Sequence, residues 1–270
     1  MIVDVALCHD CNNCFLACKD EYVGNDFKGY SVAQPWSGQR WMDILRKERG
    51  QYPMVQVAFL PKPCQHCDDA PCITKDGAVH KRKDGLVIID PKKAKGQKQI
   101  VSSCPYGVIY WNEDAGLPQK CTGCAHLIDD GWTETRCTQV CPTGSLKLVL
   151  TEDDDMAVRA TAEGLQAYEA DWGTNPRVWY KNLHRWTKAF LGGTVAYKDT
   201  DDCAEGAVVI LQSAGVKVAD VATNNYGDFI FDDLPPGTYD LVVSAAGYKP
   251  VALQADIVDS LNLGVIFVEK

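Results

Sequence analysis

The last 80 residues of the chain show short apolar runs separated by turns rich in Gly, Pro and Asn. Around position 241, the apolar residues Tyr239, Leu241 and Val243 alternate with Asp240 and Ser244, which places one face of a strand in a core. Repetition of such short runs predicts a β-sandwich. The seven predicted strands cover 192–197, 206–212, 216–223, 227–231, 237–245, 249–255 and 263–268.

The first 150 residues have a different pattern, in which short apolar runs are broken by Cys, Gly and Pro. This pattern is typical of a loop-rich domain that is stabilised largely by metal. Acidic residues at 153–155 followed by spaced apolar positions predict a connecting helix from Asp153 to Asp171, closed by Gly173. The segment Asn175–Phe190 mixes Trp, Tyr and Arg, a composition that fits both a protein interface and a linker packed on its own domain.

The net charge of −9 is unevenly distributed. Residues 191–270 carry four Lys, no Arg and twelve Asp plus Glu, a balance of −8, so residues 1–190 are near −1. We expect no nucleic-acid partner, and we expect the basic residues of the first part to offset bound anionic groups and to contact a partner protein. No apolar run approaches the ~20 residues of a membrane span, and the start MIVDVAL lacks the features of a signal peptide, so we expect no membrane partner and a cytoplasmic location.

Twelve of the thirteen cysteines lie within the first 141 residues. The spacing Cys8-x2-Cys11-x2-Cys14-x3-Cys18 is that of bacterial ferredoxins, in which three thiolates hold one [4Fe–4S] cubane and the fourth reaches another. The remaining cysteines of this region are Cys64, Cys67, Cys72, Cys104, Cys121, Cys124, Cys137 and Cys141, and Pro follows both Cys104 and Cys141. Cys203, alone in the sandwich, is interpreted as a structural or adventitious thiol.

Zinc is the alternative metal, because C-x2-C pairs also build zinc sites with four cysteine ligands, and twelve thiolates match three such sites. The four-cysteine run and the two Cys-Pro pairs favour clusters. The predicted fold class is therefore α+β: a ferredoxin-like multi-cluster domain over 1–150, a helical and aromatic connector over 151–190, and the seven-stranded sandwich over 191–270.

The cysteine groups resemble those of the small subunits of dimethyl-sulfoxide-reductase-type molybdopterin oxidoreductases, which hold four clusters. Four positions that would ligate one single cluster in that family are Asp76, Ala94, Gln97 and Ile100 here. The resemblance therefore implies three [4Fe–4S] clusters, each with a complete set of four cysteine ligands. The implied sets are Cys8, Cys11, Cys14 and Cys141 (set 1); Cys18, Cys121, Cys124 and Cys137 (set 2); and Cys64, Cys67, Cys72 and Cys104 (set 3).

The family also implies that set 1 lies nearest a large catalytic subunit that carries the molybdopterin, and that the missing cluster would have been the farthest from it. The motifs CHDCNNCFLACKDE at 8–21, RWMDILRKERGQYP at 40–53, CPYGVIYWNED at 104–114 and KCTGCAH at 120–126 more closely resemble the small subunits of cytoplasmic transhydroxylases, which move a hydroxyl between polyhydroxybenzenes such as pyrogallol and phloroglucinol. The last 80 residues resemble transthyretin-like, or carboxypeptidase-regulatory-like, modules.

This resemblance implies a non-catalytic electron-transfer subunit in a heterodimer. Two alternatives remain: the small subunit of an acceptor-dependent aromatic hydroxylase, and a freestanding ferredoxin-like carrier. The sequence shows no catalytic Ser/His/Asp set and no phosphate-binding glycine loop. His9, His66 and His126 neighbour cluster cysteines, where they fit either a hydrogen bond to sulfur or an ordinary polar loop.

Overall fold

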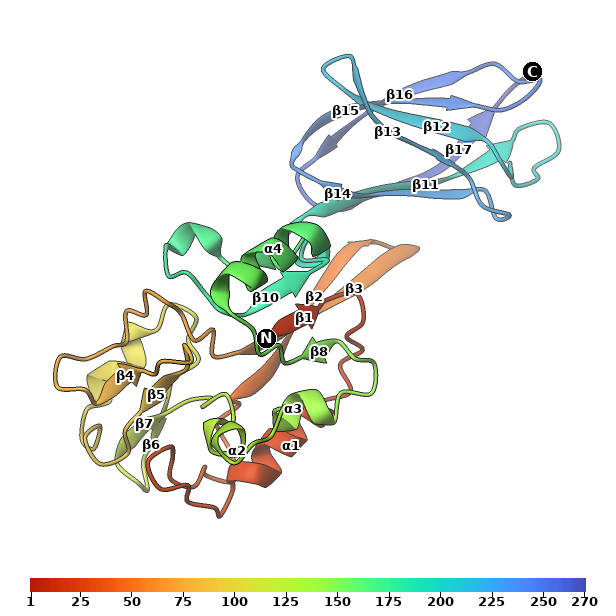
Figure 1. The fold of residues 1–270 in the computed structure, drawn as a ribbon. Helices are drawn as coiled ribbons and strands as arrows, with labels where there is room; N and C mark the ends of the chain where they lie inside the picture. The colour runs from red at the N-terminus through yellow and green to blue at the C-terminus, as the bar shows by residue number, and fades with distance from the viewer. The chain divides into compact units, whose positions relative to one another are not determined.

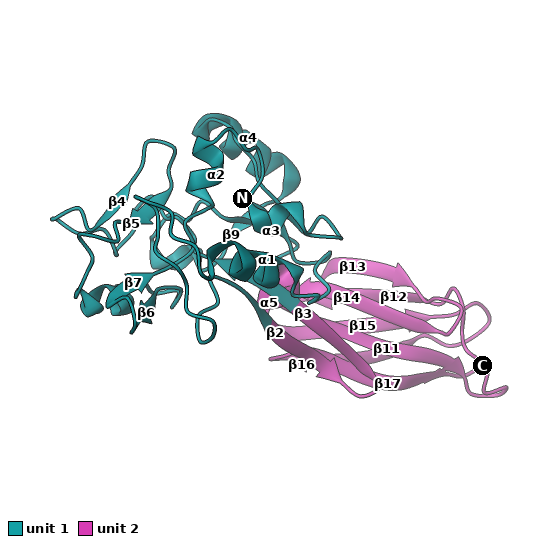
Figure 2. Cartoon of the chain, turned by 90° about the horizontal axis from the view of Figure 1, so that it is seen from below, with its two compact units in different colours: residues 1–45, 59–183 teal, residues 46–58, 184–270 magenta.

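The computed structural model describes residues 1–270, which form two compact units. Unit 1 comprises residues 1–45 and 59–183, and unit 2 comprises residues 46–58 and 184–270 (Figure 2). The hairpin of β2 (Met42–Gln51) and β3 (Met54–Pro63) therefore begins and ends in unit 1, while its tip belongs to unit 2. No helix is long and apolar enough to cross a membrane.

The centre of unit 1 is a four-stranded sheet in the order β8-β1-β10-β9. Its strands are β1 (Ile2–Asp4), β8 (Leu146–Lys147), β9 (Gln166–Ala167) and β10 (Trp179–Lys181). The parallel pairing of β1 with β10 joins the start of the chain to the aromatic segment that precedes unit 2. Tyr180 of β10 is fully buried. Of the two predicted alternatives for the aromatic segment, a protein interface or a linker packed on its own domain, β10 therefore fits the packed linker.

Three short helices carry cysteines or follow them: α1 (Asn13–Tyr22), α2 (Ala125–Asp129) and α3 (Arg136–Gln139). α3 begins with a capping box, in which the side chains of Thr135 and Thr138 each accept a hydrogen bond from the other residue's backbone amide. Figure 1 shows α1 and α3 side by side.

Two small hairpins and a 3-10 helix form the other end of unit 1. They are β4 (Val79–Lys81) with β5 (Val87–Ile89), β6 (Tyr110–Asn112) with β7 (Leu117–Gln119), and η1 (Lys98–Ser103). Figures 1 and 2 both place the β4–β5 hairpin away from α1 and α3.

The predicted helix over 153–171 was too long. The helix α4 covers Asp153–Glu163 and ends at Gly164, which adopts the left-handed conformation with φ 63°. Glycine enters this conformation at low cost, and the Gly164 amide bonds to carbonyls of the last turn. After it come β9 and the 3-10 helix η2 (Ala170–Trp172), which Gly173 closes.

The sandwich of unit 2 consists of a three-stranded sheet, β14-β11-β17, and a four-stranded sheet, β13-β12-β15-β16. Each of the seven predicted runs overlaps one strand. The strands are β11 (Ala189–Tyr197), β12 (Val208–Ser213), β13 (Val216–Ala222), β14 (Asp228–Leu234), β15 (Gly237–Ser244), β16 (Val251–Ile257) and β17 (Leu261–Val268). Their alternate residues, including Tyr239, Leu241 and Val243, form one apolar core.

Unit 2 is larger than the predicted sandwich domain, because the hairpin tip at 46–58 and the short helix α5 (His184–Thr187) belong to it. The side chain of Arg49 explains this. It is 1% exposed and donates hydrogen bonds to Asp232 of β14, to the Lys188 carbonyl and to Gln56 of the hairpin itself. A buried guanidinium thus ties the hairpin tip to the sandwich, over more than 180 residues of sequence.

Candidate iron–sulfur centres

The four thiols of set 1 lie together at the start of α1 and after α3. Burial, and then the charges of Cys8, Cys11 and Cys141, raise the pKa of Cys14 to about 12. Cys11 is exposed, and Cys8 and Cys141 are half-buried. Burial also acts to raise the pKa of Cys141, but hydrogen bonds from backbone amides and Thr143 outweigh it and lower that pKa.

Set 2 is more deeply buried. Burial, followed by the charges of Cys121, Cys124 and Cys137, raises the pKa of Cys18 well above its usual value. The Thr135 hydroxyl lies 3.1 Å from the sulfur of Cys137, where it can donate a hydrogen bond.

Set 3 lines one cavity, in which Cys64, Cys67, Cys72 and Cys104 are all present. Burial raises the pKa of Cys72 to about 12, and the charges of the other three cysteines act in the same direction against the opposing charge of Lys120. Three buried thiols and one half-buried thiol thus surround the cavity.

The three sets form a row. Cys14 of set 1 is close enough to Cys137 of set 2 to raise its pKa, after the larger effects of burial and of the set 2 thiols. Cys64 of set 3 raises the pKa of Cys121 of set 2 in the same way, second only to burial. Set 2 is therefore the middle of the row, and sets 1 and 3 are its ends.

The helices produce this order. Cys14 and Cys18 are four residues apart on α1, so they lie on one face of the helix but face different sets. Cys137 lies in α3 and belongs to set 2, whereas Cys141 lies beyond the end of α3 and belongs to set 1. Because α1 and α3 pack together, they join sets 1 and 2.

The thiols lie in surroundings that fit anionic clusters. Four thiolates near one another in a buried place repel, which favours the protonated thiols. Iron that displaced these protons would offset the thiolate charge with its own positive charge. No group of three or more His, Cys, Asp or Glu side chains could hold a single metal ion. A cubane distributes its thiolates over four iron corners, so they need not meet at one point.

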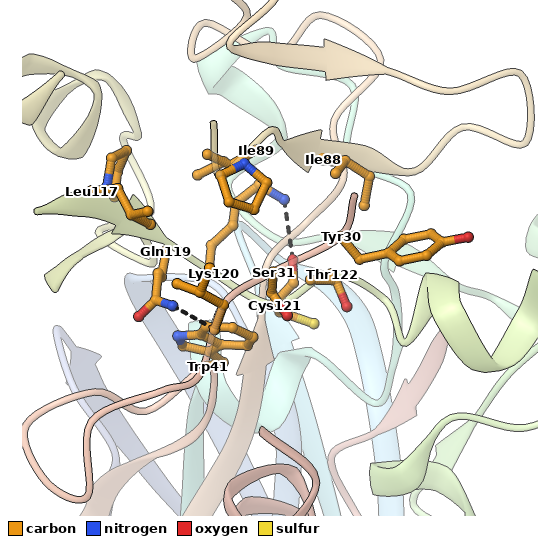
Figure 3. A pocket seen from close by; sticks show the side chains of 13 residues that line it. Tyr30, Ser31, Trp41, Ile88, Ile89, Leu117, Gln119, Lys120, Cys121 and Thr122 are labelled. Carbon is orange, nitrogen blue, oxygen red and sulfur yellow. Dashed lines mark hydrogen bonds between the residues drawn. The ribbon is translucent and has the colours of Figure 1, made fainter. Parts of the chain in front are cut away.

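A buried lysine provides a second indication of an anionic group. Lys120 is 3% exposed, and its ammonium donates hydrogen bonds to the carbonyls of Val87 and Cys121 but pairs with no carboxylate. Figure 3 shows its side chain beside Cys121. Because an unpaired buried ammonium is costly, the negative charge of thiolate-bound clusters at sets 2 and 3 fits this position.

A buried donor without a partner provides a third indication. The Nδ1 atom of His66 accepts a hydrogen bond of 3.0 Å from the Val87 amide, so in the neutral ring the proton is on Nε2. Burial lowers the pKa of His66 well below its usual value, which keeps the ring neutral. Nε2 is buried without a protein partner and points toward Gly123, between Cys121 and Cys124, where its N–H would donate a hydrogen bond to a cluster sulfur.

The other two histidines near cysteines differ. His126 bonds to Glu21 at 2.9 Å and stacks on Phe27, while His9 is exposed. His126 lies in the helix α2 and not in a loop, and its ring is held by these contacts. Among the three, only His66 has an unpartnered buried nitrogen.

The four positions that the family resemblance assigns to an additional cluster lie together and contain no thiol. Ala94 and Ile100 are buried in one apolar cluster that also includes Cys72 and Ile109. Asp76 and Gln97, on the outer side, are joined by a hydrogen bond. Ordinary side chains fill this place.

The comparisons with known proteins agree with these observations. The family model described as a 4Fe-4S dicluster domain matches residues 55–151, and that of the carboxypeptidase regulatory-like domain matches residues 191–266. The pyrogallol hydroxytransferase small subunit of Pelobacter acidigallici is 45% identical over 272 residues, which cover 98% of this chain and 97% of the relative. The chain belongs to the pyrogallol hydroxytransferase small-subunit family.

Other iron–sulfur subunits are similar to this chain over a smaller share of its length. The arsenate respiratory reductase iron–sulfur subunit of a Shewanella species is 26% identical, covering 67% of this chain and 94% of its own length. The thiosulfate reductase electron transfer subunit of Salmonella typhi is 30% identical, covering 58% and 78%. The fold of this chain is thus an iron–sulfur dicluster domain followed by a carboxypeptidase-regulatory-like β-sandwich.

Sequence reasoning missed two residues of the site. Lys120 was one basic residue among 27 Lys and Arg, and its position directly before Cys121 was the only signal of its role. Thr135 was likewise unremarkable, although its spacing of two residues from Cys137 is that of a side chain able to bond to a nearby sulfur.

Proposed function

We propose that the chain is the electron-transfer subunit of a molybdopterin-dependent transhydroxylase that moves a hydroxyl between polyhydroxybenzenes, pyrogallol to phloroglucinol. It holds three [4Fe–4S] clusters, one in each of sets 1, 2 and 3. The observation that carries the proposal is the row of three four-thiol sets in a chain 45% identical to a pyrogallol hydroxytransferase small subunit.

The number of three rests on the cysteines outside the matched region. A dicluster domain over 55–151 contains eight of the twelve cysteines. The N-terminal run adds the other four, of which three belong to set 1 and one, Cys18, belongs to set 2. With them, three sets of four cysteines are complete. Zinc in the same sets is disfavoured by this ferredoxin spacing.

The bound clusters would supply one-electron transfer along the row. The chain's own residues hold and separate the three sets, exclude water from sets 2 and 3 by burial, and tune each site. The Lys120 ammonium, the His66 Nε2 proton and the Thr135 hydroxyl all favour a more negative cluster by charge or by hydrogen bonding.

The partner is a large molybdopterin-bearing catalytic subunit in a heterodimer, and set 1 is the end of the row that faces it. Set 1 is the set with an exposed thiol, Cys11. The flanking apolar side chains Leu7 and Leu16 are 41% and 57% exposed, which suits a surface covered by a partner. Catalysis takes place on the partner, because the strongest motifs of this chain are committed to ligation. The proposed location of the complex is the cytoplasm, which is what the resemblance to the cytoplasmic transhydroxylases implies.

Two alternatives predict different behaviour. A related aromatic hydroxylase would consume an external electron acceptor, whereas a transhydroxylase returns its electrons to the second ring. A freestanding carrier would purify without a large subunit.

The test is to purify the chain with its large partner and measure phloroglucinol formation from pyrogallol with and without an added acceptor. The chain alone should give no product, and the complex should turn over without the acceptor. A strict acceptor requirement would reject transhydroxylation, and isolation of this chain without any larger molybdenum-containing partner would favour the carrier.

A further inference from the structure

The segment 75–98 is strongly basic within an acidic protein. It contains eight Lys and Arg against three Asp, a net charge of +5, while the whole chain carries −9. Three of its cations are paired: Lys81 with Asp68, Arg82 with Asp84 and Asp129, and Lys98 with Glu113. The remaining five are exposed and form no ion pair, and we name them the lysine surface: Lys75, Lys83, Lys92, Lys93 and Lys95.

This surface belongs to the loops and turns around the β4–β5 hairpin. Lys83 is in the hairpin turn, next to an open hollow lined also by His80 and Arg82. Lys75 precedes Asp76, whose bond to Gln97 joins the turn at 74–77 to the loop that carries the other lysines. The cations therefore lie on one connected loop system.

The inner side of the same loops packs on set 3. Val79 and Val87 of the hairpin and Ala94 of the loop are in one apolar cluster with Cys72, and Cys104 packs against that cluster. Figures 1 and 2 place this hairpin away from α1 and α3, the helices beside set 1, so set 3 lies toward the opposite end of unit 1. A partner that contacts the lysine surface is thus brought to the end of the row that the catalytic subunit leaves free.

We propose that the lysine surface is the docking site of a small acidic electron-carrier protein that exchanges single electrons with the cluster at set 3; this rests on the proposed function. Unpaired surface cations attract an acidic partner and accelerate the encounter at low ionic strength. In the exchange one electron leaves the reduced carrier and one is gained at set 3, and no bond forms or breaks. Such an exchange would set the redox state of the row even where the overall hydroxyl transfer consumes no electrons.

The test uses the intact complex with its large subunit and follows bleaching of visible cluster absorbance by stopped flow. The donor is a reduced plant-type [2Fe–2S] ferredoxin, an acidic carrier. The variant carries Lys75→Gln, Lys83→Gln, Lys92→Gln and Lys95→Gln; Lys93 is left because its charge also acts on Asp90. The matched control carries Lys198→Gln, Lys217→Gln, Lys249→Gln and Lys270→Gln, which change the net charge equally but lie in the sandwich.

At low salt the lysine-surface variant should be reduced about tenfold or more slowly than the wild type, while the sandwich control is unchanged. The wild-type rate should fall steeply with added salt and the variant rate should not. Photoreduced deazariboflavin, a neutral donor, should reduce all three proteins at one rate.

Equal rates of reduction by ferredoxin in wild type and variant would overturn the docking proposal. The same result is expected if the catalytic subunit covers the lysine surface, and it would overturn the proposal in that case too. Equal slowing in the sandwich control would also overturn it, because net charge alone would then explain the effect. Absence of bleaching by the neutral donor in every protein would instead overturn the proposed clusters, and the docking proposal with them.

Discussion

The side-chain amide of Gln97 donates a hydrogen bond of 2.7 Å to the carboxylate of Asp76. In the family of four-cluster subunits these two positions are expected to ligate the same cluster. Here Asp76 also accepts bonds from the Thr74 hydroxyl and the Ala78 amide, and these three bonds lower its pKa to about 2. The carboxylate is therefore used to fix a turn.

Replacement of Asp76 by Ala should leave the iron content unchanged. The turn at 74–78 should loosen, because the bonds to Thr74 and Ala78 are lost, and hydrogen exchange there should become faster. Iron analysis with exchange mass spectrometry checks both. Loss of about four iron per chain would mean that this carboxylate is itself a cluster ligand.

Replacement of Cys104 by Ser should affect only the cluster of set 3, because Cys104 lies in that cavity with Cys64, Cys67 and Cys72. The cluster at set 3 should either be absent, with about four fewer iron per chain, or lose one corner iron. The electron paramagnetic resonance signals of the clusters at sets 1 and 2 should persist. Cys203→Ser in the sandwich is the control and should change nothing, since that thiol is exposed and remote in the chain from the sets. Loss of all three signals would contradict the assignment.

Replacement of Lys120 by Met should lower the reduction potentials of the clusters at sets 2 and 3. The ammonium bonds to the carbonyls of Val87 and Cys121 and favours the more negative, reduced state of both clusters. We expect a shift of roughly −60 mV, which is about tenfold in a one-electron equilibrium, measured by a potentiometric titration. Lys217→Met, at an exposed lysine of β13, should leave the potentials unchanged. Unchanged potentials in the Lys120 variant would show that its charge does not reach the clusters.

Replacement of Asp232 by Asn should destabilise unit 2 by roughly 1–3 kcal/mol, between the values for exposed and buried pairs, because Arg49 is then left without its carboxylate. Burial acts to raise the pKa of Asp232, but the hydrogen bond and charge of Arg49 outweigh it and hold the pKa below its usual value. A depressed carboxylate pKa stabilises the fold above the unfolded-state pKa of ~3.9, and this contribution is lost as the pH falls through the folded-state pKa.

Hydrogen exchange of unit 2 between pH 6 and 3 measures this effect. The wild type should lose protection on acidification more than Asp232→Asn does, because the variant has already lost the pair. Asp233→Asn is the matched control, since Asp233 pairs with Lys188 on the surface and its loss should cost about 0.5 kcal/mol or less. Equal pH dependence in wild type and Asp232→Asn would exclude the Arg49 pair as its cause.

Local features of this protein could be predicted from the sequence. The spacing of Cys8 to Cys18 is dictated by the size of a cubane, and the alternation around Leu241 is dictated by strand geometry. The iron–sulfur region and the carboxypeptidase-regulatory-like sandwich were therefore predicted correctly. The end of α4 was predicted wrongly because two glycines, Gly164 and Gly173, both suit a helix end, and both adopt positive φ.

The features that were missed depend on contacts between distant residues. Nothing near Arg49 in the sequence indicates that its carboxylate partner is Asp232 or that the hairpin tip belongs with the sandwich. The burial of Lys120 likewise depends on Val87 of a different hairpin, 33 residues away. Such side chains become visible only when the loops are placed in space.

Iron and acid-labile sulfide per chain test the central claim most directly. In anaerobically purified complex, after subtraction of any iron assigned to the large subunit, the account predicts about twelve iron and about twelve sulfide, because three sets of four thiols are present and the fourth place is filled by Ala94, Ile100, Asp76 and Gln97. About eight of each, about sixteen of each, or zinc without sulfide would contradict it.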